Sequence, residues 1–99
     1  MILIIWEYKV KPECTRAFEE LYGHHGEWVL LFNRFAGYLG TELLKKSDEE
    51  NSYLSIDRWQ SAELYQKFLA TAKNEYQRID KQGESLMEEE KKIGSFERE

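Results

Sequence analysis

The chain has 99 residues, a formal net charge of −5, one cysteine and an aromatic content of 14%. This length fits a single domain spanning residues 1–99, and the negative charge argues against a nucleic-acid partner, because phosphate binding needs clustered Lys and Arg. A single cysteine excludes an internal disulfide framework, and no apolar run approaches the roughly 18 residues that span a bilayer, so we expect a cytoplasmic protein without a membrane partner.

The first predicted element is a strand from Ile2 to Val10, a segment rich in β-branched and aromatic residues. Alternation divides it into one face with Ile2, Ile4, Trp6 and Tyr8 and another with Leu3, Ile5, Glu7 and Lys9. Both faces begin with apolar residues, which indicates that other parts of the structure cover both sides at this end.

Two helical segments are predicted after this strand. Pro12 stops the strand, and a short helix then ends at Gly23, where we expect a left-handed cap. A second run follows Gly26 and ends at Gly37. Its apolar stripe at i, i+3, i+4 and i+7 consists of Trp28, Leu31, Phe32 and Phe35.

A hairpin with a polar turn over residues 47–52 comes next and leads into a third helical segment. Ser61 is placed to cap that segment, which we predict to be one long helix reaching past Ile79. The charged run at 88–92 is predicted to be a solvated face, and Ile93 and Phe96 indicate a closing strand.

This order of elements predicts an α+β fold, the ferredoxin-like βαββαβ arrangement with an antiparallel sheet and a split first helix. Helices would cover one sheet face only. The other face would carry Leu3, Ile5 and part of the hairpin, and an exposed apolar patch of this kind usually marks an interface.

The hairpin region also carries a family resemblance. Its motifs are Gly37-Tyr38-Leu39-Gly40-Thr41-Glu42-Leu43, then Tyr53-Leu54-x-Ile56-Asp57-x-Trp59-x-Ser61, with outlying matches from Tyr8-x-Val10-x-Pro12 to Ile93-Gly94-x-Phe96. They resemble the antibiotic biosynthesis monooxygenase (ABM) domain family, in which the strand after the hairpin typically ends in Trp just before a helix-capping Ser. The resemblance implies a homodimer through the sheet faces that forms a dimeric α/β barrel.

Asp57, Trp59 and Asn33 are the candidate catalytic residues. Asp57 and Trp59 share a strand face and could address a ligand in a cleft between sheet and helices. Alternatively, Trp59 is a core residue and Asp57 satisfies a backbone group, which is the commoner role of such side chains. Asn33 lies one position off the apolar stripe of its helix, where it either binds a ligand or is solvated.

Six further aromatic residues are candidates for substrate binding, although each could equally fill the core. They are Trp6, Tyr8, Tyr53, Tyr65, Phe68 and Tyr76. For an ABM-type oxygenase, the resemblance implies a base at Asp57 or Tyr76 and hydrogen-bond donors at Trp59, Asn33 or Tyr53.

No metal or cofactor is expected. His24 and His25 are adjacent and have no third ligand at a recognisable spacing, and no Gly-rich phosphate loop is present. The resemblance implies oxygenases that act without metal or flavin on electron-rich aromatic substrates. The haem-degrading branch of the family uses a histidine where this chain has the stretch 76–78, which contains none.

We therefore expect a cofactor-independent monooxygenase that acts on a small phenol-like or quinol-like aromatic compound. The alternative is a dimeric domain of the same fold that binds a small molecule, or has a structural role, without chemistry.

Overall fold

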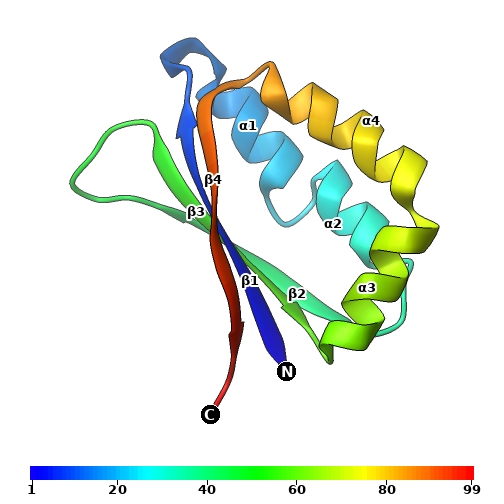
Figure 1. The fold of residues 1–99 in the computed structure, drawn as a ribbon. Helices are drawn as coiled ribbons and strands as arrows, with labels where there is room; N and C mark the ends of the chain where they lie inside the picture. Colours follow the sequence, from blue (N-terminus) through cyan, green and yellow to red (C-terminus); the bar gives the residue numbers. More distant parts are fainter.

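The computed structural model describes every residue from Met1 to Glu99 and consists of one four-stranded antiparallel sheet with helices on one face (Figure 1). The elements are β1 (Ile2–Val10), a short 3-10 helix η1 (Pro12–Cys14), α1 (Thr15–Tyr22), α2 (Glu27–Phe32), β2 (Tyr38–Lys45), β3 (Ser52–Trp59), α3 (Ala62–Thr71), α4 (Lys73–Glu84) and β4 (Met87–Glu97). This order confirms the ferredoxin-like α+β arrangement predicted from the sequence. None of the helices is both long and apolar enough to cross a membrane.

β1 lies in the middle of the sheet, whose strand order is β2-β3-β1-β4. Ile4 is opposite Asp57, and Trp6 is opposite Ser55, so the side chains of these residues share the face that the helices cover. Ile4 is 1% exposed and Trp59 at the end of β3 is fully buried. The face of β1 that carries Ile2, Ile4, Trp6 and Tyr8 therefore packs against the helices and forms part of the core.

The first helical region is split, as predicted, because the chain turns between α1 and α2. At Gly26, an added Cβ would lie 2.1 Å from the Leu21 carbonyl oxygen, so only glycine fits this close approach. The expected left-handed cap at Gly23 is wrong, because its φ of −81° and ψ of −174° are extended. The left-handed conformation occurs instead at Gly37, with φ +96°, just before β2.

The second helical region is also broken, so the prediction of one long helix is wrong. Ala72 separates α3 from α4, with φ −97° and ψ 21°, and its side chain is 2% exposed. Figure 1 shows the two helices at an angle, so that both follow the curved sheet. The apolar spacing persists through the bend because both halves still face the same core, and spacing alone does not reveal such a bend.

β4 is longer than the predicted closing strand, because it includes the charged run at 88–92. It pairs with β1 and forms one edge of the sheet, where charged side chains discourage pairing with another chain. The run is exposed, as expected. Its strand geometry nevertheless places Glu90 opposite Tyr8 and Lys92 opposite Trp6, on the helix side of the sheet.

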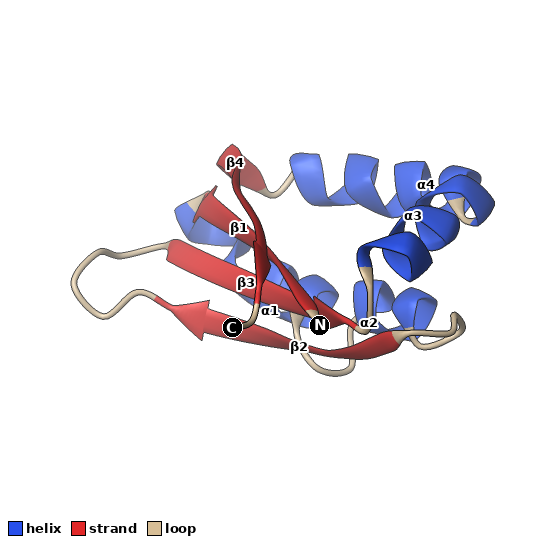
Figure 2. Ribbon diagram, turned by 60° about the horizontal axis from the view of Figure 1, so that its bottom comes forward, coloured by secondary structure: helices blue, strands red, loops and turns tan.

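No helix covers the other side of the sheet, which we call the open sheet face (Figure 2). Apolar side chains from all four strands lie on it: Leu3, Ile5, Leu44, Leu54, Ile56 and Phe96. Phe96 is 47% exposed and Leu44 is 42% exposed. Four strands thus contribute to one uncovered apolar surface.

Candidate functional site

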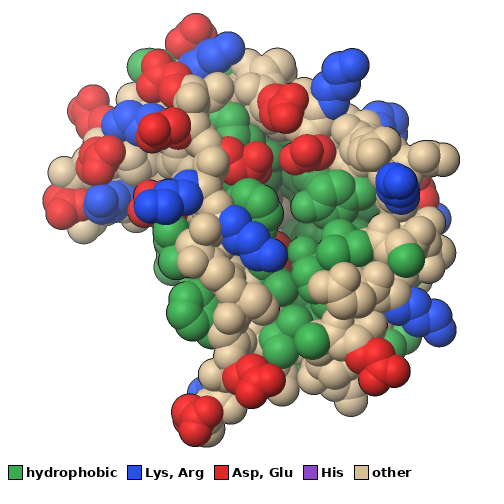
Figure 3. Space-filling view, in the orientation of Figure 1, with side chains coloured by type: hydrophobic (Ala, Val, Ile, Leu, Met, Phe, Trp, Pro, Cys, Tyr) green, Lys and Arg blue, Asp and Glu red, His purple; other side chains and the backbone are tan.

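A narrow cavity of about 30 Å³ lies between the helix-covered sheet face and the helices, and we call it the central cavity. Its lining residues are Trp6, Tyr8, Tyr22, Trp28, Phe32, Thr41, Ser55, Asp57, Tyr76, Asp80 and Glu90. Figure 3 shows the hollow above it, with hydrophobic side chains on both sides and acidic side chains along its upper edge. Typical ligand sites measure roughly 300–1,000 Å³, so in this form the cavity holds only a small group.

Asp57 reaches the cavity from β3 and is oriented by a short chain of hydroxyl groups. Thr41 Oγ1 donates a hydrogen bond of 2.7 Å to Asp57 Oδ1, and Tyr38 Oη lies 2.5 Å from Thr41 Oγ1. Because Thr41 uses its single proton on the carboxylate, Tyr38 must be the donor to Thr41. Sequence reasoning selected Asp57 but missed Thr41, its cross-strand neighbour.

No Lys, Arg or His side chain forms an ion pair with Asp57. Burial raises the pKa of Asp57 from 3.8 to about 6, and the hydrogen bond from Thr41 opposes this rise. A carboxylate with such a pKa is ionised at neutral pH and is a stronger base than an ordinary aspartate.

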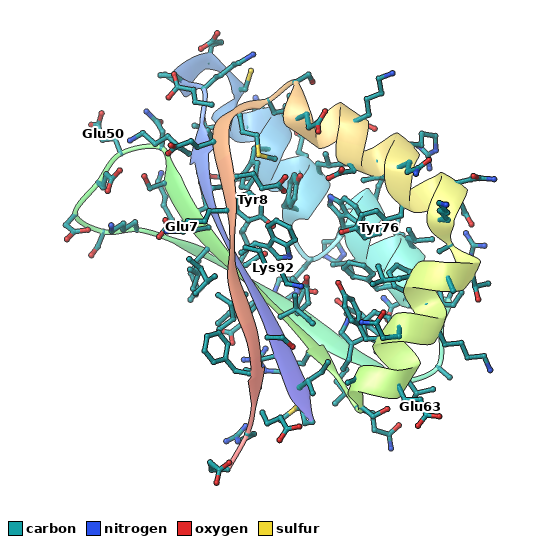
Figure 4. All side chains as sticks on the ribbon, in the orientation of Figure 1. Glu7, Tyr8, Glu50, Glu63, Tyr76 and Lys92 are labelled. Carbon is teal, nitrogen blue, oxygen red and sulfur yellow. The ribbon has the colours of Figure 1, made fainter.

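Tyr8 and Tyr76 extend toward the hollow from the sheet and from α4, respectively (Figure 4). The Tyr8 hydroxyl forms a 2.8 Å hydrogen bond with Ser55 Oγ. Burial raises the pKa of both tyrosines well above the usual value for a phenol. Both hydroxyls therefore stay protonated at neutral pH, which suits Tyr76 to donate a hydrogen bond rather than to act as the base.

Two residues of the cavity lining, Tyr22 and Trp28, each carry a buried polar atom, the hydroxyl and Nε1 respectively, that makes no well-aligned hydrogen bond. Tyr22 on α1 is 5% exposed and Trp28 on α2 is 7% exposed. Buried polar groups are normally satisfied, but both atoms are shut off from solvent, and the Tyr22 hydroxyl packs closely against Gly83 of α4. Sequence reasoning assigned Trp28 to an apolar stripe and did not propose Tyr22 as a site residue, because apolar spacing does not show where a polar tip points.

Asp80 on α4 and Glu90 on β4 add two carboxylates to the cavity lining. Partial burial raises the pKa of Asp80, helped by the negative charge of Glu84. Partial burial, together with the charges of Asp80 and Glu84, raises the pKa of Glu90 to about 7. The side chain of Glu90 is solvent-exposed, so this carboxylate lies at the mouth of the cavity rather than inside it.

Of the nine residues proposed from the sequence, the structure brings four together at this cavity: Trp6, Tyr8, Asp57 and Tyr76. Trp59, Tyr65 and Phe68 instead pack on one another in the core, with the Trp59 and Phe68 rings 5.1 Å apart and the Trp59 and Tyr65 rings 5.5 Å apart. These three residues do not line the cavity.

The remaining two sequence candidates lie elsewhere. Asn33 follows the last residue of α2, and its side chain is exposed. Tyr53 donates a hydrogen bond to Glu19 and does not line the central cavity. The expected catalytic role of Asn33 and the expected substrate-binding role of Tyr53 therefore have no geometric support at this cavity.

A larger depression of about 670 Å³ lies beside the turn of the β2–β3 hairpin. Only 4 of its 13 lining residues are hydrophobic, and most of the others are charged, such as Glu49 and Lys91. An aromatic compound would gain little apolar burial there, because ligand sites are lined mainly by apolar side chains. The central cavity is therefore the stronger candidate, although it is the smaller of the two.

The geometry does not suggest a metal centre. No three His, Cys, Asp or Glu side chains are arranged to hold a metal ion. His24 and His25 are exposed in the turn between α1 and α2. What the cavity offers is one buried carboxylate, several neutral hydroxyl groups and aromatic walls.

Comparison with known proteins found one matching family model and several similar solved structures. The family model described as "Antibiotic biosynthesis monooxygenase" matches residues 1–79. None of the curated proteins matches the chain in sequence.

Several solved structures share the fold. A variant of SnoaB, a cofactor-independent oxygenase from Streptomyces nogalater, has a TM-score of 0.82 at 20% identity, covering 98% of this chain and 91% of the other. The ActVA-Orf6 monooxygenase of Streptomyces coelicolor, in complex with nanaomycin D, has a TM-score of 0.77 at 16% identity, with coverages of 99% and 87%. A conserved protein from Methanosarcina mazei has a TM-score of 0.74 at 12% identity, with coverages of 99% and 92%. At these identities the similarity establishes the fold alone.

Proposed function

The chain belongs to the antibiotic biosynthesis monooxygenase family, and from this membership we propose that it is a cofactor-independent monooxygenase of a small, electron-rich aromatic compound. The reaction would take place at the central cavity, with Asp57 as the base. Cytoplasmic location and action as a single domain of residues 1–99 are further parts of this proposal.

The observation that carries the proposal is the state of Asp57. Its carboxylate is ionised at neutral pH, has no cationic partner and is held by the Thr41 hydroxyl alone. A buried charge without a counter-ion costs stability, and such costs are typical of functional sites. A purely structural role would be served as well by a neutral asparagine.

The proposed chemistry needs no external reductant. Asp57 removes a proton from an acidic C–H or O–H group of the substrate, and the resulting anion transfers one electron to dioxygen. Recombination of the two radicals forms a C–O bond at a carbon that still carries a hydrogen, and protonated Asp57 returns its proton to the peroxide anion. Loss of water from the resulting hydroperoxide leaves a carbonyl group. One oxygen atom enters the product and the other becomes water, and all four electrons come from the substrate.

A neutral donor in the cavity would stabilise the anion that this chemistry creates. Tyr76 lines the cavity, and its hydroxyl remains protonated. Hydrogen bonds to a developing oxyanion in a poorly solvated site are worth more than in water. We therefore assign Tyr76 to oxyanion stabilisation.

The volume of the cavity limits how the substrate binds. A space of about 30 Å³ admits one polar group of the substrate, while the aromatic ring occupies the hollow above it in Figure 3. Trp6 and Tyr76 are half-buried and border that space. Stacking on these two rings would hold the substrate ring.

We also propose a homodimer that forms through the open sheet face. A second copy of the chain would bury the six apolar residues named above for that face. The helices do not cover these residues, because all of them pack on the opposite side of the sheet. Family membership supports the same assembly, because the resemblance implies a dimeric α/β barrel.

The alternative is a domain that binds a small molecule without chemistry. The observation in its favour is that aromatic side chains, including Trp59 and Phe68, fill most of the interior and leave only a small cavity. Such a domain would bind a ligand but would not consume dioxygen.

Both alternatives can be tested on the purified protein with a panel of phenols, hydroquinones and anthrones. A ligand-dependent rise in melting temperature would report binding to the folded state, and an oxygen electrode would report turnover of the same compounds. Binding together with oxygen uptake supports the monooxygenase, whereas binding without uptake supports the non-catalytic domain.

A further inference from the structure

The strand register arranges the open sheet face in rows that run across the strands in the order β2, β3, β1, β4. Three successive rows are Gly40, Arg58, Leu3, Phe96; then Glu42, Ile56, Ile5, Gly94; then Leu44, Leu54, Glu7, Lys91. The six apolar residues of this face lie along the diagonal from Phe96 to Leu44. We call this band the apolar stripe.

Charged residues flank the apolar stripe on both sides. On one side, Arg58 of β3 and Glu42 of β2 form an ion pair. On the other side, Glu7 of β1 and Lys91 of β4 are directly opposite each other, and both are exposed. Each side of the stripe therefore carries one acidic and one basic residue.

The direction of the stripe limits how two copies can pack by this face. From Phe96 to Leu44 it crosses three strand spacings while advancing two rows, so it runs at about 45° to the strands. Two copies packed face to face are related by a two-fold axis that lies between the sheets. One stripe covers the other only if this axis runs along the stripe or directly across it. In both cases the strands of the two copies cross at about 90°, a known mode of sheet packing.

The two arrangements bring different charges together. With the axis along the stripe, Arg58 approaches the partner's Lys91, and Glu42 approaches the partner's Glu7. With the axis across the stripe, Arg58 approaches the partner's Glu42 instead, and each Glu7 lies near the partner's Lys91. Like charges held together at an interface disfavour an arrangement strongly, so the axis across the stripe is the favoured one.

We propose that the protein recognises a second copy of itself through two reciprocal ion pairs, each between Arg58 of one copy and Glu42 of the partner, with the two-fold axis directly across the apolar stripe. At both ends of the stripe, Phe96 then packs on the partner's Leu44. This inference rests on the proposed homodimer and adds which residues meet in it.

The reciprocal pairs explain why charges lie beside an apolar surface. If a partner covered Arg58 and Glu42 with apolar side chains alone, both charges would lose water without compensation. Opposite charges from the partner compensate for that loss, and a guanidinium has enough N–H donors for two carboxylates. The pairs thus select one orientation of the second copy, because the other arrangement opposes like charges.

Charge reversals test the pairs, with the dissociation constant of the dimer measured by analytical ultracentrifugation. Glu42→Arg and Arg58→Glu should each weaken the homodimer by at least about tenfold, because each places like charges across the axis. An equal mixture of the two variants should restore a tight dimer, since one copy then supplies only positive and the other only negative charge. Such recovery would also show that both variants fold.

Glu20→Arg is the matched control. Glu20 forms an ion pair with Arg16 on α1, so this change also reverses a charge and breaks an ion pair, but away from the open sheet face. The control should dimerise as the wild type does.

Engineered cysteines test the direction of the axis, in a Cys14→Ser background that removes the native thiol. A mixture of Leu44→Cys and Phe96→Cys proteins should form a disulfide-linked heterodimer under mild oxidation. Phe96→Cys alone should not cross-link, because its two copies would lie at opposite ends of the stripe. With the axis along the stripe, the two copies of residue 96 would instead face each other.

The outcomes separate this inference from the proposals on which it rests. If the wild type dimerises but the charge reversals do not weaken it, or if their mixture fails to recover a tight dimer, the reciprocal pairs are refuted and the homodimer stands. Self-cross-linking of Phe96→Cys, or no cross-link in the mixture, refutes the orientation. A monomeric wild type overturns the homodimer and this inference together, while oxygen uptake tests the monooxygenase independently.

Discussion

Thr41 and Asp57 face each other across the β2–β3 ladder, and the Thr41 hydroxyl donates a 2.7 Å hydrogen bond to the carboxylate. This contact orients Asp57 without neutralising it, because a hydroxyl carries no charge. A lysine or arginine in the same place would lower the pKa of Asp57 and weaken it as a base. The arrangement therefore keeps the carboxylate both positioned and basic.

Asp57→Asn should make the protein more stable at neutral pH. The folded state raises the pKa of Asp57 from 3.8 to about 6, so between these values it binds more protons than the unfolded state. Ionised Asp57 thus reduces the free energy of unfolding at pH 7, and this cost disappears as the pH falls through 6 toward 4. Urea denaturation should show a gain of about 1–3 kcal/mol at pH 7.

The same comparison at pH 4 supplies the control, because Asp57 is then mainly protonated in the folded protein. The gain from Asp57→Asn should shrink or vanish there. A variant that is less stable than the wild type at both pH values would show that the carboxylate has a structural role.

Thr41→Val should raise the pKa of Asp57 further, because it removes the hydrogen bond that opposes the effect of burial. Valine has nearly the same shape as threonine, so the strand pairing should persist. NMR titration of the Asp57 carboxyl carbon would measure the change. Thr41→Ser keeps the hydroxyl and should leave the titration near that of the wild type, and an unchanged titration in Thr41→Val would refute the orienting role.

Ile56→Asp should convert the proposed dimer into a monomer. Ile56 lies on the open sheet face beside β2, so a charge there would be buried at the interface without a partner. Light scattering at micromolar concentration should give the dimer mass for the wild type and the monomer mass for the variant. Leu30→Asp adds the same charge at a 60% exposed position on α2 and should stay dimeric, whereas a monomeric wild type would contradict the assembly.

Gly83→Ala should destabilise the fold through Tyr22. An added Cβ would lie 2.2 Å from the Tyr22 hydroxyl oxygen, a clash that outweighs the better helix propensity of alanine. We expect a loss of about 1–2 kcal/mol in denaturant unfolding. In a Tyr22→Phe background the nearest side-chain contact becomes 3.1 Å, to Cζ, so the loss should largely disappear. An equal loss in both backgrounds would mean that the hydroxyl is not the cause.

The fold was largely predictable from the sequence, because apolar alternation and helical spacing report which side of each element is buried. This applies to the two faces of β1 and to the break at Gly26. The bend at Ala72 was not predictable, because α3 and α4 keep the same apolar spacing on either side of it. The strand at 88–92 was missed because its side chains are charged on both faces of an edge strand.

The site was less predictable than the fold. Asp57 stood out as a carboxylate beside apolar residues in a strand, and the structure places it at the central cavity. Tyr22 and Trp28 did not stand out, because their rings follow the same spacing as the core and only their polar tips differ. Glu90 was hidden within a run of charges, and its position depends on pairing between strands that are distant in sequence.

Oxygen consumption by the wild type and Asp57→Asn, side by side, with an electron-rich anthrone or catechol under isotope-labelled dioxygen, tests whether Asp57 is the base of a monooxygenase. We expect the wild type to consume oxygen and to place one labelled oxygen atom in the product. We expect the folded Asp57→Asn variant to be at least about 100-fold slower, the scale of a lost general base. Equal rates for the two proteins, or a product without label, would show that Asp57 does not have this role or that the protein is not a monooxygenase of this compound.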